Sequence, residues 1–197
     1  MRPPATVVKD SRRLDLDEFG AQFAAAWSRL DERFLKLECW QEYQELEAVE
    51  SQNAYNRGDI NLARELLRGE AESDRPLYQD VKRRNIYYAR IRLVHLPLTA
   101  YLDYEMMAYA TRAQLGENIR VVKFPETIPL PSEEYFDFLL FDRHIALIHD
   151  YGSDAVGVQS GGWLVDNPEI IKLLEDKALT ALRDAVPVER FLTVEGG

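Results

Sequence analysis

The stretch ARIRLVHLPLTAYLDYEMMAYATRAQLGENIRVV, residues 89–122, decides the fold that this sequence predicts. Residues 86–96 are rich in aromatic and branched side chains, which is typical of a strand, and a proline follows them. Thr99 is a suitable N-cap for a helix that ends at Gly116. Residues 118–124 then resume the extended pattern. A strand, a helix and a second strand with short connections predict the right-handed crossover of a parallel sheet.

The N-terminal segment begins with an arm. Residues 1–14 contain two prolines and mixed charge, and we expect them to be flexible. Asp15 with Glu18 fits a capping box, which predicts a helix over residues 16–30. Residues 33–41 alternate in polarity as a short strand does.

Residues 42–84 predict a helical insertion made of separate pieces. A glycine at Gly58 divides the first two helices, and Gly69 suits the C-terminal end of the second. Pro76 then opens another short helix over residues 77–83. The insertion resembles one unit of a helical repeat, but no second copy follows, so we do not predict a solenoid.

The C-terminal third predicts a hairpin and a helix. Residues 135–141 and 145–151 are two apolar strands separated by a tight turn. The glycine-rich residues 152–162 predict a flexible loop. Asn167 is the N-cap of a helix that reaches about residue 185. Together the segments predict an α/β fold in which residues 15–197 form one domain, with a single mixed sheet of about five strands flanked by helices.

Size and charge limit the classes of function. A chain of 197 residues that is 46% hydrophobic can bury one core, and its net charge of −10 works against binding nucleic acid or anionic membranes over its whole surface. No run of about 18 apolar residues suits a membrane span, and the N-terminus lacks the apolar core of a signal peptide. The single cysteine, Cys39, excludes an internal disulfide. We therefore expect a cytoplasmic protein.

The common catalytic and cofactor motifs are absent from the sequence. It contains no Gly-x-Ser-x-Gly elbow, no phosphate-binding loop that ends in Gly-Lys and no dinucleotide fingerprint. The histidines His95, His144 and His149 form no His-x-x-x-His pair. We expect neither a metal nor a cofactor.

The polar residues around the organising stretch suggest a pocket. Arg90 and Arg92 lie on one face of an alternating strand, where guanidinium groups can bind a carboxylate or a phosphate. Tyrosine and glutamate side chains recur on one face of the following helix. The ligand-binding candidates are Glu38, Tyr43, Arg90, Arg92, Tyr101, Tyr104, Glu105, Glu117, Arg120 and Asp142.

A structural interpretation competes with this pocket, and we favour it for the charged residues. Arg90 or Arg92 would pair with Glu105 or Glu38 in a partly buried network, because buried charges must be paired. Asp142, which with Asp150 could form an acid-base pair, would instead be a turn former.

The same residues carry a resemblance to a known family. The chain resembles the actinobacterial domain-of-unknown-function family 6879 over residues 19–192, although residues 48–78 look longer than usual and Tyr78 stands where the family has tryptophan. The matching motifs are Leu37-Glu38 with Tyr43, residues 90–94 with Pro97, Tyr101 and Glu105, residues 116–120, residues 137–142, and Ala185-Val186-Pro187.

The resemblance implies that the protein binds a partner, and it implies no particular reaction. Members of the family are similar to small proteins encoded beside helix-turn-helix regulators in development and specialised metabolism. A looser similarity links the chain to phospholipase-D-like sensor domains of bacterial regulators. None of the three histidines begins the His-x-Lys signature of active phospholipase-D enzymes, so we expect that chemistry to be absent.

Three functions therefore compete. We expect a non-enzymatic regulatory or accessory protein that binds a helix-turn-helix regulator or a small ligand through the Arg/Tyr/Glu pocket. The alternative is an enzyme of specialised metabolism, a transferase or hydrolase, that uses the same pocket and needs a carboxyl group of raised pKa. A purely structural interaction module would expose an apolar patch near Met106-Met107 and Phe191-Leu192.

Overall fold

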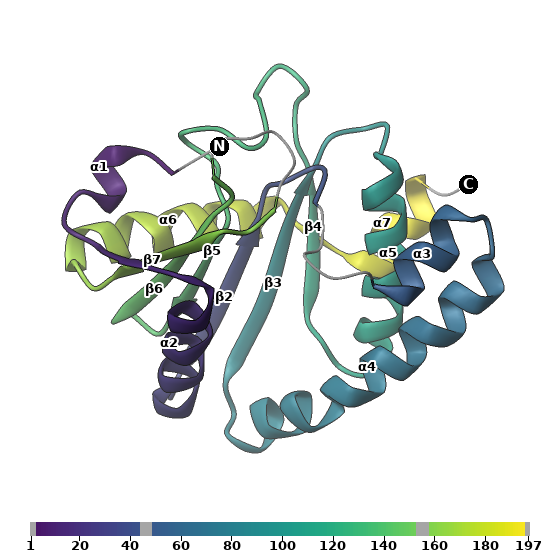
Figure 1. The fold of residues 1–197 in the computed structure, drawn as a ribbon, viewed down its shortest axis with the longest axis horizontal. Coiled ribbons are helices and arrows are strands. Elements are labelled where there is room, and N and C mark those ends of the chain that lie inside the picture. Colours follow the sequence, from purple (N-terminus) through teal and green to yellow (C-terminus); the bar gives the residue numbers. More distant parts are fainter. Residues whose placement is uncertain (1–2, 44–48, 153–157, 196–197) are drawn as a thin grey trace.

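One mixed sheet of eight strands organises the molecule (Figure 1). A computed structural model describes residues 3–43, 49–152 and 158–195. The strand order is β1-β7-β6-β5-β2-β3-β4-β8. The strands are β1 (Arg12–Leu14), β2 (Arg33–Glu38), β3 (Tyr87–Val94), β4 (Ile119–Lys123), β5 (Phe138–Phe141), β6 (Ile145–Asp150), β7 (Gly161–Val165) and β8 (Val186–Pro187).

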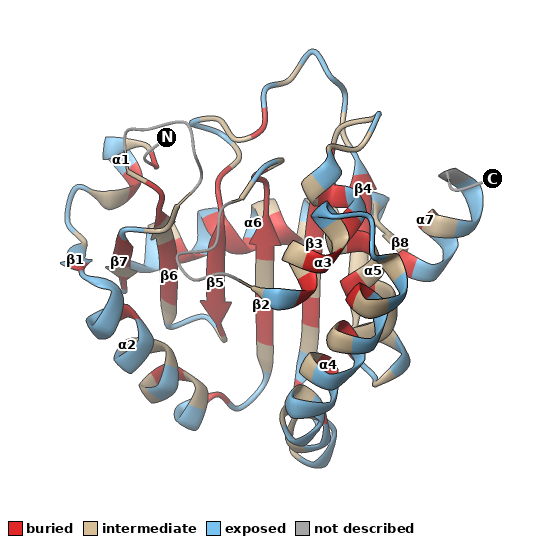
Figure 2. Ribbon diagram, turned by 45° about the vertical axis from the view of Figure 1, so that its right-hand side comes forward, coloured by how far each residue is buried: buried red, intermediate tan, exposed pale blue. Residues whose placement is uncertain are grey.

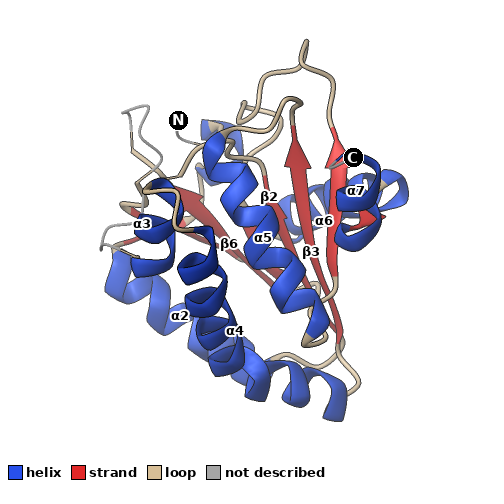
Figure 3. Cartoon of the chain, turned by 90° about the vertical axis from the view of Figure 1, so that its right-hand side faces the viewer, coloured by secondary structure: helices blue, strands red, loops and turns tan. Residues whose placement is uncertain are grey.

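Helices cover both faces of the sheet (Figure 3). They are α1 (Ala5–Val8), α2 (Leu16–Arg29), α3 (Glu50–Asn56), α4 (Ile60–Arg83), α5 (Ala100–Gln114), α6 (Pro168–Asp184) and α7 (Val188–Glu195). Helices α2 to α5 lie on one face and α6 lies on the other. We call the face that carries α2 and α5 the front face.

The predicted crossover is present. Strands β2, β3 and β4 are parallel neighbours, and α5 joins β3 to β4. The Thr99 side chain caps α5 by accepting a hydrogen bond from the Leu102 amide. Every other strand pair is antiparallel, so the sheet is mixed as expected.

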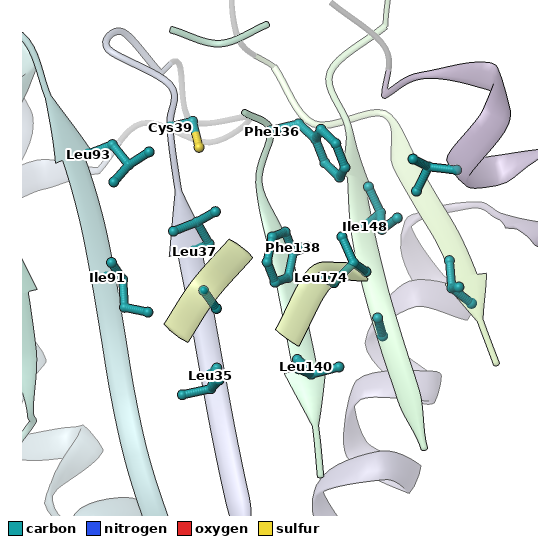
Figure 4. Packing of buried hydrophobic residues seen from close by; sticks show 14 of the residues in the cluster. Leu35, Leu37, Cys39, Ile91, Leu93, Phe136, Phe138, Leu140, Ile148 and Leu174 are labelled. Carbon is teal, nitrogen blue, oxygen red and sulfur yellow. The ribbon is translucent and has the colours of Figure 1, made fainter. Parts of the chain in front are cut away.

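The back of the sheet holds the largest apolar cluster. Alternate residues of β2, β3 and β5, such as Leu37, Ile91 and Phe138, point toward α6, which contributes Leu174 (Figure 4). Burying each such side chain stabilises the fold by about 1.5–3 kcal/mol. The central strands are accordingly buried along most of their length (Figure 2).

The prediction of about five strands was wrong, because it missed β1, β7 and β8. Strand β7 begins inside the segment 152–162, which we expected to be a flexible loop, and β1 lies in the expected arm. The two segments pair with each other, and Leu14 is completely buried. Gly162 takes its place in the sheet because its backbone approaches the Phe19 ring and the Ile148 carbonyl too closely for a side chain.

The insertion also differs from the expected series of short helices. Helix α4 runs without interruption through Gly69 and Pro76. Its buried residues Ala63, Leu67, Ala71 and Tyr78 recur at helical spacing, so one packed face extends past Gly69 and Pro76. Packing therefore outweighs the unfavourable local preferences of glycine and proline.

Candidate functional site

The candidate site lies on the front face, where the central strands β2 and β3 run side by side. In the parallel register, Lys36 pairs with Arg90 and Glu38 with Arg92, and partners in register point to the same face. Helix α2 packs on one side of these residues and α5 on the other. Between them is a cavity of about 250 Å³ lined by Lys36, Glu38, Trp40, Tyr43, Arg90, Arg92, Tyr101, Glu105, Arg112, Asp137, His149, Tyr151 and Gln159.

Glu38 is the central acceptor of this cavity. Its carboxylate lies 2.7 Å from Lys36 Nζ and 3.4 Å from Arg90 Nη1, and it accepts a hydrogen bond of 3.0 Å from the Tyr109 hydroxyl. Burial opposes ionisation of Glu38, but the charges of Lys36, Arg90 and Arg92 outweigh it and hold its pKa well below the ordinary value. Glu38 is therefore a carboxylate at neutral pH.

Arg90 is held from behind by a second carboxylate, Glu117. Arg90 Nε donates to Glu117 over 2.7 Å, and the hydroxyls of Tyr78 and Tyr88 donate to the same carboxylate over 2.6 and 2.8 Å. Burial raises the pKa of Glu117, but Arg90 and the two hydroxyls outweigh this effect and the net pKa is lowered. The expected pairing of Arg90 with Glu38 is thus present, and Glu117 belongs to this structural network and not to the cavity wall.

Arg92 differs from Arg90 because it forms no ion pair with any carboxylate that the structure describes. Its side chain is only 2% exposed, and its Nη2 donates to the Trp40 carbonyl. Its Nε finds no hydrogen-bond partner among the described residues. The guanidinium carbon lies 5.9 Å from the centre of the Tyr101 ring. Arg92, a residue of the cavity wall, therefore keeps one buried N–H without an acceptor among the described residues.

Aromatic rings form the rest of the wall. The Trp40 and Tyr151 rings are 4.7 Å apart, and the Tyr43 ring lies 5.8 Å from Tyr151 and 6.2 Å from Tyr101. Such rings suit an apolar or planar ligand group beside the charged side chains.

Seven wall residues were absent from the sequence-based candidates: Lys36, Trp40, Arg112, Asp137, His149, Tyr151 and Gln159. Asp137 accepts hydrogen bonds from the Cys39 amide at 2.6 Å and the Tyr151 hydroxyl at 2.7 Å. Burial raises the pKa of Asp137, and burial together with the Lys36 charge lowers the pKa of His149 to about 4. The available signal was an aspartate within an otherwise apolar strand, YFDFLLF.

One protein family matches most of the chain, including the residues of the cavity. The family described as Domain of unknown function (DUF6879) matches residues 21–193. The chain belongs to this family. The comparison with curated proteins finds no match. Membership therefore names a family without a stated activity, and the site itself must carry the functional argument.

The structure separates the candidate residues of this DUF6879 chain into two groups. Glu38, Tyr43, Arg90, Arg92, Tyr101 and Glu105 all line the cavity. Tyr104 instead bonds to Ser51 of α3 at 2.7 Å. Arg120 pairs in register with Ile91, which faces α6, and its Nε donates to Asn118 at 2.8 Å. It therefore lies on the opposite face of the sheet from the cavity.

Asp142 is also remote from the cavity of the DUF6879 chain. It occupies the β5–β6 turn with a φ of 51° and accepts hydrogen bonds from the backbone amides of Asp31, Glu32 and Arg33. This arrangement agrees with the turn-forming interpretation. Within the described residues, no group of three or more His, Cys, Asp or Glu side chains is placed to hold a metal ion. The described helices also include none with the length and apolar character that a membrane crossing requires.

Proposed function

We propose that this DUF6879 protein is a non-enzymatic accessory protein that binds a small anionic ligand in the cavity between β2, β3 and α5. The observation that supports this proposal most directly is Arg92, a buried guanidinium whose Nε has no described acceptor and whose charge has no described ion pair. A buried unsatisfied donor costs about 1–3 kcal/mol, and a ligand acceptor would recover that free energy.

The other charged groups of the cavity favour a ligand with a single negative charge. Lys36 and Arg90 already contact Glu38, and Arg112 lies 3.4 Å from Asp74. Arg92 lies in the field of Glu38 and Asp137 but makes no contact ion pair, so it is the cavity cation that a ligand anion can pair with directly. A carboxylate matches the planar guanidinium and carries one charge at neutral pH.

The accessory role rests on the family resemblance and on the absence of a catalytic motif in the sequence. We propose that the cytoplasmic partner is a helix-turn-helix regulator of actinobacterial type, and that ligand binding alters the association. The loose likeness to catalytically silent phospholipase-D-like sensor domains fits the same proposal, because a sensor must bind its ligand without converting it.

An NMR titration of the ¹⁵N-labelled protein with butyrate tests the ligand site. We expect a saturable shift of the Arg92 Nε–H resonance, and loss of butyrate binding in Arg92→Gln. Arg190→Gln, which changes an exposed arginine of α7, is the matched control and should bind butyrate normally. Normal butyrate binding by Arg92→Gln would refute the site.

Capture of the tagged protein from a native lysate tests the accessory role. Mass spectrometry should find a helix-turn-helix regulator in stoichiometric amount. Butyrate added to the lysate should change the amount of regulator that is retained. A protein that emerges alone and converts a retained metabolite would contradict the accessory role.

The enzyme alternative keeps one specific observation in its favour. It requires a carboxyl group of raised pKa beside the cavity, and Asp137 has that property, whereas Glu117 does not. However, the Asp137 carboxylate already accepts bonds from the Cys39 amide and Tyr151, which fix it as a structural acceptor. An Asp137→Asn variant that folds and binds butyrate but loses a measured turnover would restore the enzyme alternative.

A further inference from the structure

A second cleft adjoins the cavity and combines an aromatic and aliphatic wall with a few polar side chains, among them Asp74. It has a volume of about 310 Å³ and is lined by residues of α2, α4, β2 and β3. Its walls include Phe23 and Trp27 from α2, Phe34 from β2 and Leu77 from α4. Rings of α2 and the sheet pack closely here, with Phe23 and Trp27 stacked at 5.9 Å and Trp27 lying 5.3 Å from Phe34.

The two hollows share walls. Lys36, Arg90 and His149 line both of them, so at most one layer of side chains separates the cavity from the cleft. Glu38 lies 2.7 Å from Lys36, and Glu117 lies 2.7 Å from Arg90, so the two shared cations are already compensated. The boundary between the hollows is therefore nearly neutral, and an apolar group can pass over the aliphatic parts of these side chains.

The cavity and the cleft differ in polarity along the line that joins them. At one end is Arg92, which has no described ion pair and an unpartnered Nε. At the other end are the aromatic and aliphatic side chains of the cleft, together with the Asp74 carboxylate, which repels an anionic ligand group. A ligand that satisfies both ends is anionic at one end and apolar at the other.

We propose that the natural ligand is an amphipathic monocarboxylate, whose carboxylate binds Arg92 and whose apolar body occupies the cleft between α2 and α4. This inference rests on the proposed function and adds the chemical class of the ligand. The cavity of about 250 Å³ is smaller than the usual ligand site and the cleft of about 310 Å³ is at the lower limit of that range, whereas the two together fall well within it.

Calorimetric titrations with butyrate, octanoate and octanol test the proposal on the full chain. Octanoate should bind at least about tenfold more tightly than butyrate, because its additional methylenes are removed from water. Octanol, which has the same chain without the charge, should bind at least about tenfold more weakly than octanoate. Arg92→Gln should weaken both acids by about tenfold or more.

Substitution of Leu77 separates the cleft from the cavity. Leu77→Glu adds a second carboxylate to the cleft beside Asp74 and should reduce octanoate affinity to that of butyrate, while butyrate affinity stays unchanged. Retained butyrate binding shows that this variant is folded, and Leu77→Gln provides a second, uncharged variant. Leu173→Glu changes an exposed leucine of α6 on the other face and should leave both acids unaffected.

The outcomes distinguish the two proposals. Equal affinities for butyrate and octanoate, both dependent on Arg92 and both unchanged in Leu77→Glu, would overturn the amphipathic ligand and leave the proposed function intact. Octanol binding as tight as octanoate, with no effect of Arg92→Gln, would overturn the proposed function and this inference with it. Absence of heat with either acid would overturn both.

Discussion

Tyr78 of α4 donates a hydrogen bond to Glu117 over 2.6 Å, and this contact joins the helical insertion to the polar centre of the sheet. Glu117 is 3% exposed and binds Arg90 through the same carboxylate group. A buried ion pair contributes little in itself, but removal of one partner leaves the other charge without compensation. Glu117 should therefore matter more to folding than to ligand binding.

Glu117→Gln should lower the free energy of unfolding by about 3 kcal/mol, because Arg90 loses its closest counter-charge. Urea denaturation at pH 7 measures this change, with the exposed Glu126→Gln as the control. The folded pKa of Glu117 is lowered, so its contribution is present above the ordinary glutamate pKa and is lost as the pH falls below it. Glu117→Gln should therefore lose less stability than wild type below about pH 4.3. Identical acid unfolding of the two proteins would contradict the assignment.

His149 should make the protein sensitive to acid in a different pH range. Burial and the Lys36 charge lower its pKa from 6.5 to about 4, so the unfolded chain binds a proton more readily between these values. Stability is then present above pH 6.5 and decreases as the pH falls toward 4. Between pH 7 and pH 5 this loss should be on the order of 1 kcal/mol, reduced by the partial solvent access of the ring.

Comparison of two histidine variants isolates this effect. His149→Gln should lose less free energy of unfolding than wild type between pH 7 and pH 5, as measured by urea denaturation at each pH. His144→Gln changes an exposed histidine in the β5–β6 turn and should behave as wild type does. If both variants follow the wild-type pH dependence, His149 is not the group responsible.

The central part of the fold could be predicted because its signals are local. The strand, the Thr99 cap and the Gly116 stop lie within one stretch, and they produce β3, α5 and β4 in the expected order. Strands β1, β7 and β8 gave no such signal. Each is five residues or shorter, and β1 and β8 pair only with strands distant in the sequence, while β7 joins β1 to its sequence neighbour β6, so their existence depends on tertiary packing.

The part of the candidate site that lies on β3 could also be predicted, because its signal is local. Alternation along β3 places Arg90 and Arg92 on the same face. The same rule applied to β4 puts Arg120 on the opposite face from Ile119, which faces α5. Asp137 and His149 could not be placed, because their position depends on the antiparallel register of β5 against β2 and of β6 against β5. Register between distant strands is not visible in local pattern.

Two glycines should respond to alanine in opposite directions. At Gly162 a Cβ would lie 2.6 Å from the Phe19 ring and would also meet the Ile148 carbonyl oxygen, which cannot move without disturbing β6. Gly162→Ala should therefore cost about 2–3 kcal/mol. At Gly69, an exposed position in α4, a Cβ meets nothing within 4 Å, and Gly69→Ala should stabilise the protein by about 0.5–1 kcal/mol. Thermal and urea unfolding of both variants test the pair, and a stabilising Gly162→Ala would show that β7 is not packed as described.

Asp142 provides a test that separates a turn former from a catalytic acid. Its carboxylate accepts hydrogen bonds from the Glu32 and Arg33 amides at 2.9 and 2.7 Å, and its backbone has a φ of 51°, which asparagine tolerates better than alanine does. Asp142→Ala removes the acceptor and strains the turn, so it should cost about 2 kcal/mol. Asp142→Asn keeps one acceptor oxygen and the turn preference, and it should lose less than half of that amount.

Ligand binding makes the same distinction for Asp142 independently of stability. Because Asp142 lies outside the cavity walls, both variants should bind octanoate as wild type does under conditions in which they are folded. Asp166→Ala, which changes an exposed aspartate after β7, controls for the loss of one negative charge. An Asp142→Asn variant that is fully stable but no longer binds octanoate would return Asp142 to the functional site.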